Sequence, residues 1–309
     1  MTLVRTPFDG TSVPFTIGLR PLDPAEWIEP DDRLSDHLAQ KEALYASAPE
    51  KVFAAETDTI EAQGEVLGLV VQHLPAHFPD LYSRDGETIE IVPTQRRISI
   101  NERPEAPLVT ASRLVQEDLV LMRKGELGWR LAAAALCFPS SWSLAEKFAR
   151  PLDDIHAPVP GFAAGTRPAA LIARIFDSLQ VDQPVERLNW SLQEDDRLHH
   201  PRSKDARDAG IHPGAGGLLG NDLFAGTFIR VERQTLRRLP LSGDILFTIR
   251  IHLDPLRQLA LHPHAGRLAG SLADQLDALN ESQLAYKGIT ENRDALVGLL
   301  RAMAERQPA

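Results

Sequence analysis

The sequence LVQEDLVLMRKGELGWRLAAAALCFPSSWSLAEKFARPLDDIHAPVP, residues 114–160, contains the clearest structural pattern in the chain. Its two apolar runs, at 119–122 and 129–138, are separated by RKGELG, a charged segment with two glycines in which a chain reverses easily. This pattern predicts two antiparallel strands joined as a hairpin. The hairpin leads into the segment that carries His156.

The segment after the hairpin is expected to form a short helix and then a rigid turn. Ser140 or Ser141 can cap the start of the helix, and a proline ends it. In DIHAPVPG, Pro158 and Pro160 fix their own φ angles and disfavour helix at the residues before them. We therefore expect a stiff loop to present the imidazole of His156.

Composition places the chain among ordinary globular proteins. With 309 residues, 43% of them hydrophobic and 25% charged, it can form one large domain or two modest ones. No window approaches the ~18 to 20 apolar residues of a membrane helix, and MTLVRTPFDG is not a secretory signal, so we expect a cytoplasmic location. The net charge of −10 argues against nucleic-acid binding as the main task. The single cysteine, Cys137, lies in an apolar run and predicts a buried structural thiol.

The first hundred residues are expected to be mostly helical after an extended arm. Prolines and glycines punctuate residues 1–30, helices are predicted from residue 35 and over 49–72, and a strand pair is predicted at 89–91 and 98–100. His73 and His77 have the spacing of two metal ligands on one helix face. Prolines at 75 and 79 disturb that geometry and no acidic partner has a suitable spacing, so a metal site is not favoured.

The second half contains another group of predicted strands. VERLNWSLQ, residues 185–193, alternates as a strand with one expected break in register around Arg187. Residues 227–239 and 244–253 are joined by a Pro/Gly turn and should pair as a second hairpin. The last 50 residues return to helical periodicity.

This order of elements predicts an α+β fold. Strands grouped beside separate helices are typical of that class and not of a doubly wound fold. Five antiparallel strands interrupted by helices after the second are the layout of a PAS-like sheet, whose concave face and helical side wall enclose one pocket. We predict an extended arm at residues 1–34 and one α+β domain at 35–309 with flanking helices and a PAS-like core at about 112–256.

Polar residues on the predicted strands are candidates for that pocket. Because strand side chains alternate, Arg230, Glu232 and Gln234 share one face, while Val231 and Arg233 share the other. An inward-facing charged group is costly unless it is paired or binds a ligand. The alternative is a solvated outer face. The same question applies to Arg187, Asn189, Trp190 and Arg250.

Several segments together resemble one known family, related to the catalytic α subunit of haem-dependent oxidative N-demethylase. They are LVQEDLVLM, WRLAAAALCFPSSW, EKFARPLDDIHAPVPG, VERLNWSLQ, FIRVERQTLRRLP and ILFTIRIHLDPL, and the resemblance covers roughly residues 15–300. It implies haem b in a PAS-like domain, with O2 used to oxidise an N-methyl group of a small secondary amine and to release formaldehyde. It also implies electrons from partner components that carry flavin, an iron–sulfur centre and NADPH. The chain has neither a cysteine set for a cluster nor a G-x-G-x-x-G after a strand.

The resemblance also directs attention to an axial ligand for the iron. His156 is our first choice, and His199 and His200 are its rivals. His252, His262 and His264 are weaker candidates, and Cys137, Met122 and Met303 lie in packing contexts.

Roles for the other candidates follow from the same resemblance. Glu232 is expected to hold an ammonium group of the substrate, and Arg230 to stabilise bound O2 or to neutralise a haem propionate. Arg187, Asn189, Trp190, Gln234 and Arg250 are expected to bind the cofactor. His252 stands where relatives more usually have Tyr, so the substrate is not fixed as dimethylamine. The alternatives are a haem-based gas sensor, a protein that binds another small ligand, and a scaffold with a closed cavity.

Overall fold

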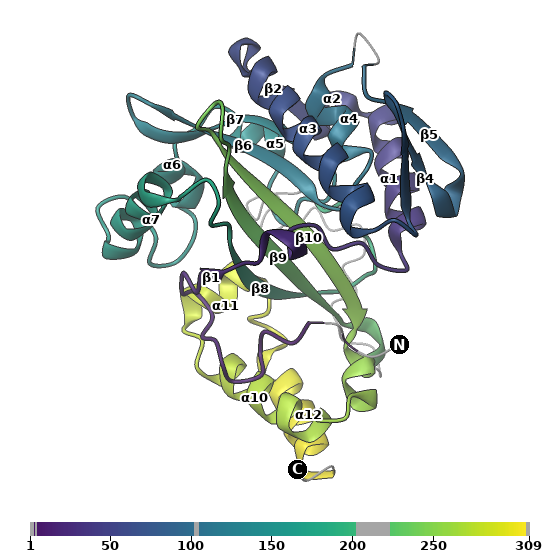
Figure 1. Ribbon diagram of the computed structural model, residues 1–309. Helices are drawn as coiled ribbons and strands as arrows, with labels where there is room; N and C mark the ends of the chain where they lie inside the picture. Colours follow the sequence, from purple (N-terminus) through teal and green to yellow (C-terminus); the bar gives the residue numbers. More distant parts are fainter. Residues whose placement is uncertain (1–2, 4, 102–104, 202–222, 307–309) are drawn as a thin grey trace.

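The computed structural model describes residues 3, 5–101, 105–201 and 223–306, and its centre is an antiparallel sheet (Figure 1). The strand order is β1-β8-β9-β10-β6-β7-β2. The five long strands are β6 (Asp118–Gly125), β7 (Gly128–Ala135), β8 (Val185–Gln193), β9 (Phe228–Arg238) and β10 (Ile245–Pro255). They correspond to the five predicted strands, and both predicted hairpins are confirmed.

Two short strands that the sequence pattern does not indicate extend this sheet at its edges. β1 (Arg20–Pro21) pairs with β8, and β2 (Phe53–Ala55) pairs with β7. The prediction of one helix over residues 49–72 is therefore wrong, because α2 (Pro49–Val52) ends at β2 and α3 (Ile60–His77) begins after it. The pairing with β7 explains the difference, since an added strand satisfies backbone groups that a free edge exposes.

The pairing of β8 with β9 is regular along its whole length. It runs from Val185↔Leu236 to Gln193↔Phe228 without a shift, so the predicted break around Arg187 is wrong. A register shift occurs instead in the first hairpin, between Leu121 and Met122. Because the alternation of β8 is unbroken, all its odd-numbered residues point to one side of the sheet.

A second sheet and three helices pack beside the central sheet. β3 (Tyr82–Asp85), β4 (Thr88–Ile91) and β5 (Arg96–Ser99) form this sheet, and β4 and β5 confirm the predicted strand pair. Side chains of α1 (Leu34–Ser47), α3 and α4 (Pro107–Ser112) join it in one buried apolar cluster, which also contains Leu119 and Leu246 of the central sheet.

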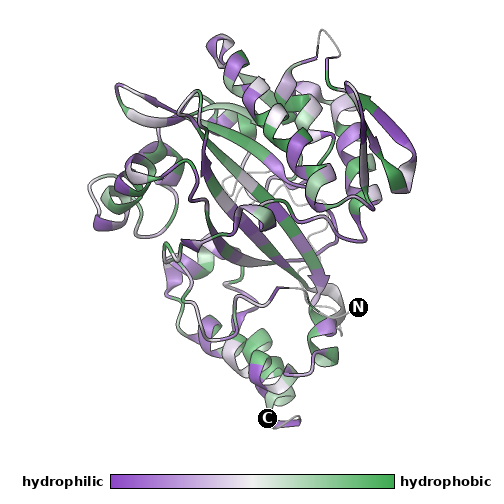
Figure 2. Cartoon of the chain, in the orientation of Figure 1, coloured by the Kyte–Doolittle hydropathy of each residue, from purple (hydrophilic) through white to green (hydrophobic). Residues whose placement is uncertain are grey.

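The central sheet is covered on both faces. On one face, called the α6 face here, Leu236, Ile249 and Ile251 pack towards α5 (Leu144–Lys147), α6 (Leu152–His156) and α7 (Arg167–Ser178). The other face, called the strap face, is crossed by the N-terminal strap, residues 26–33, and packs against α10 (Ala265–Asp277) and α12 (Arg293–Arg306) (Figure 1). Figure 2 shows hydrophobic and hydrophilic bands alternating along the strands, as a sheet with two distinct faces requires.

The remaining helical segments are short. They are η1 (Pro24–Glu26), η2 (Thr57–Thr59), η3 (Val92–Thr94), α9 (Leu223–Gly226), η4 (Leu256–Leu261) and α11 (Glu281–Lys287). Within the predicted N-terminal arm, the regular elements before α1 are β1 and η1, among the residues that the structure describes. Within the described ranges, no helix combines the length and the apolar character that crossing a membrane requires.

Two buried arginines of the sheet hold the N-terminal strap. Arg233 donates to the carbonyl oxygen of Trp27 at 3.0 Å. Arg250 donates to the carbonyl oxygen of Glu29 at 3.0 Å and forms an ion pair with Asp31 at 2.5 Å. Because charge-assisted hydrogen bonds are stronger than neutral ones, these contacts fix the strap on the sheet.

Buried histidines predict loss of stability in mild acid. Burial lowers the pKa of His37 from 6.5 to about 3 and the pKa of His73 from 6.5 to about 4. Below pH 6.5 the unfolded chain takes up protons that the folded chain excludes, so the free energy of unfolding falls as the pH falls from 6.5 to about 4. Each histidine contributes about 1.4 kcal/mol per pH unit over that window. Urea denaturation at a series of pH values measures this slope.

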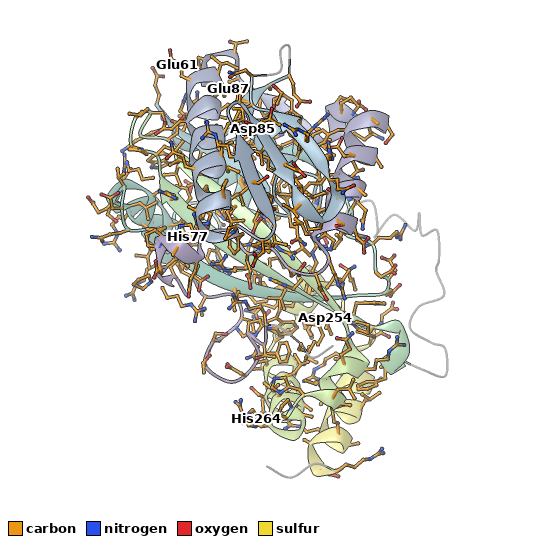
Figure 3. The ribbon with its side chains drawn as sticks, turned by 45° about the vertical axis from the view of Figure 1, so that its right-hand side comes forward. Glu61, His77, Asp85, Glu87, Asp254 and His264 are labelled. Carbon is orange, nitrogen blue, oxygen red and sulfur yellow. The ribbon has the colours of Figure 1, made fainter. Side chains whose placement is uncertain are left out.

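A pair of variants separates this effect from general acid sensitivity. His37→Gln should reduce the slope, because a glutamine has no proton to gain where Gln116 now contacts the buried Nδ1 of His37 at 3.0 Å. His77→Gln should change the slope less than His37→Gln does, since His77, labelled in Figure 3 at the C-terminal end of α3, is exposed and acts only through the charge that it places beside His73. Equal slopes in wild type and His37→Gln would contradict the explanation.

Candidate functional site

The α6 face carries a group of polar side chains on β8 and β9. The register pairs Arg187 with Gln234, Asn189 with Glu232, and Ser191 with Arg230. Directly paired residues of antiparallel strands point to the same face. The predicted placement of Arg230, Glu232 and Gln234 on one face is therefore confirmed, and Arg187 and Asn189 join them.

Glu232 lies at the centre of this group. Its Oε2 accepts a hydrogen bond from Gln234 Nε2 at 2.9 Å and a longer one from Asn189 Nδ2 at 3.5 Å. Its Oε1 lies 3.5 Å from Arg230 Nε. Two amides and a guanidinium thus orient one half-buried carboxylate.

Arg230 is wholly buried, which excludes a solvated outer face at this position. It donates to the carbonyl oxygens of Phe138 at 2.6 Å and Leu198 at 3.2 Å. Burial lowers its pKa, while the attraction of Glu232 and Asp118 opposes that change. The guanidinium is therefore fixed by the backbone behind the site.

Buried charges hold the turn that carries one of these carbonyl groups, that of Phe138. The carboxylate of Asp118 accepts from the backbone N–H groups of Cys137 and Phe138, both at 2.8 Å. The ammonium group of Lys41 lies 4.0 Å from Asp118, and both side chains are buried. This buried pair holds the turn after β7, whose Phe138 carbonyl faces Arg230. The buried state predicted for Cys137 is confirmed.

Two cations near Glu232 have no acidic partner in hydrogen-bond contact among the described residues. The Nε atom of Arg187 is buried and makes no hydrogen bond with any of them. Lys147, from α5, places its ammonium group 4.4 Å from the centroid of the Trp142 ring. Burial lowers the pKa of Lys147 to about 8, and the attraction of Glu232 opposes this change.

α11 contributes two further residues to the surroundings of Glu232. Lys287 donates to the carbonyl oxygen of Trp190, and burial lowers its pKa to about 8 while Glu232 acts in the opposite direction. Burial and the charge of Glu232 raise the pKa of Tyr286 to about 12. Sequence analysis does not identify Lys147, Tyr286 or Lys287, because only the packing of α5 and α11 brings them to these strands. Their residue types and spacing carry no signal.

His156 is the last residue of α6, so its expected position in a loop is wrong. The helix extends to His156 because the first proline after it, Pro158, is too far along the chain to prevent this. The short helix before it is capped by Ser143, in a capping box with Glu146, and not by the serines predicted for that role.

The imidazole of His156 lies among groups that favour its neutral form. Burial and the positive charges of Lys147 and Arg187 together lower its pKa to about 4, although a hydrogen bond to the backbone of Leu152 opposes them. The Phe162 ring lies 6.4 Å away, centroid to centroid. A neutral imidazole is the form that binds metal ions.

Two of the predicted site residues lie on the opposite face of the sheet. Trp190 donates from Nε1 to Gln275 of α10 at 2.9 Å, and Arg250 holds the N-terminal strap. The alternation of side chains along a strand explains this. Trp190 pairs with Val231 and Arg250 pairs with Arg233, and both partners point away from the face of Glu232. The structure therefore does not bring these two side chains to Glu232. His252 lies on the strap face as well, 3.4 Å from Glu29.

The rival histidines each contact the protein through one ring nitrogen, as His156 does through the backbone of Leu152. His199 contacts the carbonyl oxygen of Cys137 through Nδ1 at 2.7 Å, and His200 contacts Asp195 through Nε2 at 2.9 Å. The rings of His262 and His264 lie 5.8 Å apart beside α10. Among the residues that the structure describes, no set of three His, Cys, Asp or Glu side chains could hold a metal ion alone. A porphyrin supplies its own nitrogen ligands, so a single histidine suffices for haem.

The chain matches the model of one known protein family over most of its length. The family model described as haem-dependent oxidative N-demethylase, alpha subunit-like, matches residues 18–297. The match includes the two hairpins, α6 and β8, and it confirms the resemblance carried by the sequence motifs. The family's description points to an oxidative N-demethylase and to an assembly with other subunits. The chain belongs to the haem-dependent oxidative N-demethylase, alpha subunit-like family.

Proposed function

We propose that this chain binds haem b on the α6 face of its sheet and, with O2, removes an N-methyl group from a small secondary amine as formaldehyde. The observation that carries the proposal is the unpaired charge around Glu232. Arg187 and Lys147 lie close enough to His156 to affect its pKa, and neither contacts an acidic residue within the described ranges. Buried cations are costly unless an anion joins them.

Haem b fits this combination of residues. Its iron takes one or two axial ligands from the protein, and its two propionates are anions. His156 would supply a neutral imidazole, while Arg187 and Lys147 would hold the propionates. The half-buried apolar side chains of Ile155, Phe148 and Ile172 belong to the apolar cluster between the α6 face and its covering helices. They would pack against a flat apolar ring. Trp190 and Arg250 have no part in this proposal, because they contact other elements.

The sheet itself supports a PAS-like description of the core. The five long strands are antiparallel neighbours, and α5, α6 and α7 lie in the chain between the second and the third of them. These helices cover one face, as a side wall of the proposed pocket would. β1 and β2 are additions to that core.

Glu232 is suited to bind the amine. A carboxylate holds a secondary ammonium group by a charge-assisted hydrogen bond. Gln234 and Asn189 donate to Oε2 of Glu232, which fixes the direction of the carboxylate. Arg230 is committed to two backbone carbonyls, so its main effect is to position Glu232.

The chemistry also requires electrons and protons. One O2, two electrons and two protons convert the N-methyl amine into the demethylated amine, formaldehyde and water. Bound haem would supply the activation of O2. We propose that partner subunits with flavin, iron–sulfur and NADPH components deliver the electrons, which agrees with the alpha-subunit description of the family.

Reconstitution with haem tests the proposal. The purified chain should take up about one haem per chain and develop a sharp Soret band. With a reductant, O2 and dimethylamine or another small N-methyl amine, it should release formaldehyde in step with amine consumption. A chain that never develops a Soret band would overturn the haem assignment. Spectral shifts with O2 or CO but no formaldehyde from any amine would favour the gas sensor.

Replacing Glu232 by Gln should weaken binding of the amine without loss of haem. A hydrogen bond to a charged group contributes about 1.5–3 kcal/mol, so KM should rise about tenfold to a hundredfold. The Soret band should stay at the wild-type position. Glu146→Gln is the matched control, because that exposed carboxylate lies beside Lys147 in sequence but outside the proposed site. An unchanged KM in Glu232→Gln would argue against the role of Glu232.

A further inference from the structure

The strap face of the sheet carries a second group of unpaired polar atoms. Trp27 is wholly buried and His73 is 8% exposed. The Nε1 atom of Trp27, Nε2 of His73 and Nε of Arg237 are buried and have no hydrogen-bond partner among the described residues. Native proteins pair nearly all such atoms with protein, water or a ligand. Three such atoms on neighbouring side chains therefore need an explanation.

These three side chains come from separate elements and meet in space. Trp27 follows η1 in the N-terminal strap, His73 lies on α3, and Arg237 lies near the end of β9. The rings of Trp27 and His73 are 5.3 Å apart between centroids and nearly perpendicular. The Cζ atom of Arg237 lies 4.9 Å from the Trp27 centroid. The ring of His77, one turn along α3, lies 4.3 Å from that of His73 between centroids and is tilted against it by 36°.

The chemistry of this group favours a negatively charged ligand. An indole N–H and a guanidinium are hydrogen-bond donors only, so what joins them must accept. Arg237 forms no ion pair with a described residue, although Asp182 attracts it from a distance. Burial and the positive charges of His77 and Arg237 lower the pKa of His73 to about 4. The group is thus rich in donors and lacks a carboxylate.

The positions of the donors also limit the shape of the ligand. The guanidinium lies over the face of the indole ring, whereas the indole N–H lies in the plane of that ring. An ion with two oxygen atoms can accept from the guanidinium with one oxygen and from the indole N–H with the other, more easily than a monatomic ion can. A carboxylate has this form and matches the planar guanidinium.

We propose that Trp27, His73 and Arg237 form a binding site for a small carboxylate, on the opposite side of the sheet from Glu232. The carboxylate accepts hydrogen bonds from Trp27 Nε1–H and from the Arg237 guanidinium, and His73 lines the site. The proposal does not depend on haem or on demethylation, because no residue of the α6 face takes part.

Formate is the probe, and the indole N–H resonances of the protein report its binding. The chain has four tryptophans, and Trp27→Phe identifies the resonance of Trp27. Adding sodium formate in place of sodium chloride, at constant ionic strength, should shift the Trp27 resonance saturably and leave the other indole resonances in place. The titration itself uses the wild-type chain, and only the assignment of the resonance requires Trp27→Phe.

Two arginine variants give a matched comparison. Arg237→Met removes the donors, keeps a side chain of similar length, and should abolish the saturable shift. Arg238→Met should retain it, because Arg238 lies on the other face, where its guanidinium is 5.7 Å from the Trp129 centroid and donates to the Leu179 carbonyl oxygen. Circular dichroism checks that both variants are folded.

Three results would overturn the proposal. The first is a Trp27 resonance that responds to formate no more than to chloride. The second is a saturable shift that survives in Arg237→Met. The third is a crystal structure in the presence of formate in which only water contacts Trp27 Nε1 and Arg237.

Discussion

Replacement of His156 by alanine is expected to abolish specific haem binding. After reconstitution, the variant should show the broad absorption of unligated haem in place of the wild-type Soret band, and gel filtration should remove most of the pigment. His156 ends α6, on the side of the sheet that carries Arg187 and Glu232, and it is half-buried beside Phe162. An imidazole in this position would bind the iron while the sheet supplies the opposite wall of the site.

The rival histidines provide the controls for this experiment. His199 contacts a backbone carbonyl and His200 contacts Asp195, each through one ring nitrogen, whereas His156 lies beside the unpaired charges of Lys147 and Arg187. His199→Ala and His200→Ala should both keep the wild-type Soret band. Imidazole added to His156→Ala should restore a ligated spectrum if the cavity left by the side chain admits it. A wild-type spectrum in His156→Ala, or loss of haem in His200→Ala alone, would move the axial ligand elsewhere.

The long strands could be predicted because their signals are local. Alternation of apolar residues and the Gly/Pro turns locate both hairpins, and the same alternation by itself places Arg230, Glu232 and Gln234 on one face. The segment at residues 53–55 shows the limit of local signals. It lies in a helical pattern, and only its contact with β7 makes it a strand.

Which residues belong to the site depends on how the strands pair, and the sequence of a single strand does not show that pairing. Asn189 and Trp190 are neighbours in sequence, yet one faces Glu232 and the other faces α10. Which of the two belongs to the site follows from the pairing of β8 with β9. Arg250 is misplaced by sequence reasoning for the same reason, because β10 meets β9 with Arg250 opposite Arg233. The resemblance to a family identifies these segments but not the direction of each side chain.

The supporting residues Lys41 and Asp118 also lie beyond the reach of sequence patterns. Lysine and aspartate are rarely fully buried, so both residue types predict surface positions when the packing is unknown. In the structure Lys41 donates to the carbonyl oxygens of Glu117 and Ser112, and Asp118 holds the turn that contains Phe138. The site on β9 therefore depends on charges that lie behind it.

Replacing Lys41 by Met is expected to destabilise the chain by about 3–5 kcal/mol, because removal of one partner leaves the other charge buried without compensation. Lys41 and Asp118 are 0% exposed, and their charged groups lie 4.0 Å apart. Burial already raises the pKa of Asp118, and the attraction of Lys41 opposes that rise. Without Lys41 the carboxyl group should bind a proton more readily. Urea denaturation measures the loss of stability. The difference in free energy of unfolding between wild type and variant, taken at the same pH, should be smaller at acidic than at neutral pH.

The same substitution at an exposed ion pair separates burial from charge. Lys124 lies 2.7 Å from Asp177, and both side chains are about half exposed, so Lys124→Met should cost less than about 1 kcal/mol. Addition of Asp118→Asn to Lys41→Met should recover part of the lost stability, because the amide keeps a carbonyl oxygen for the backbone N–H groups and carries no charge. If Lys41→Met and Lys124→Met cost the same, the buried pair does not hold the turn behind Arg230, and another contact must position the Phe138 carbonyl.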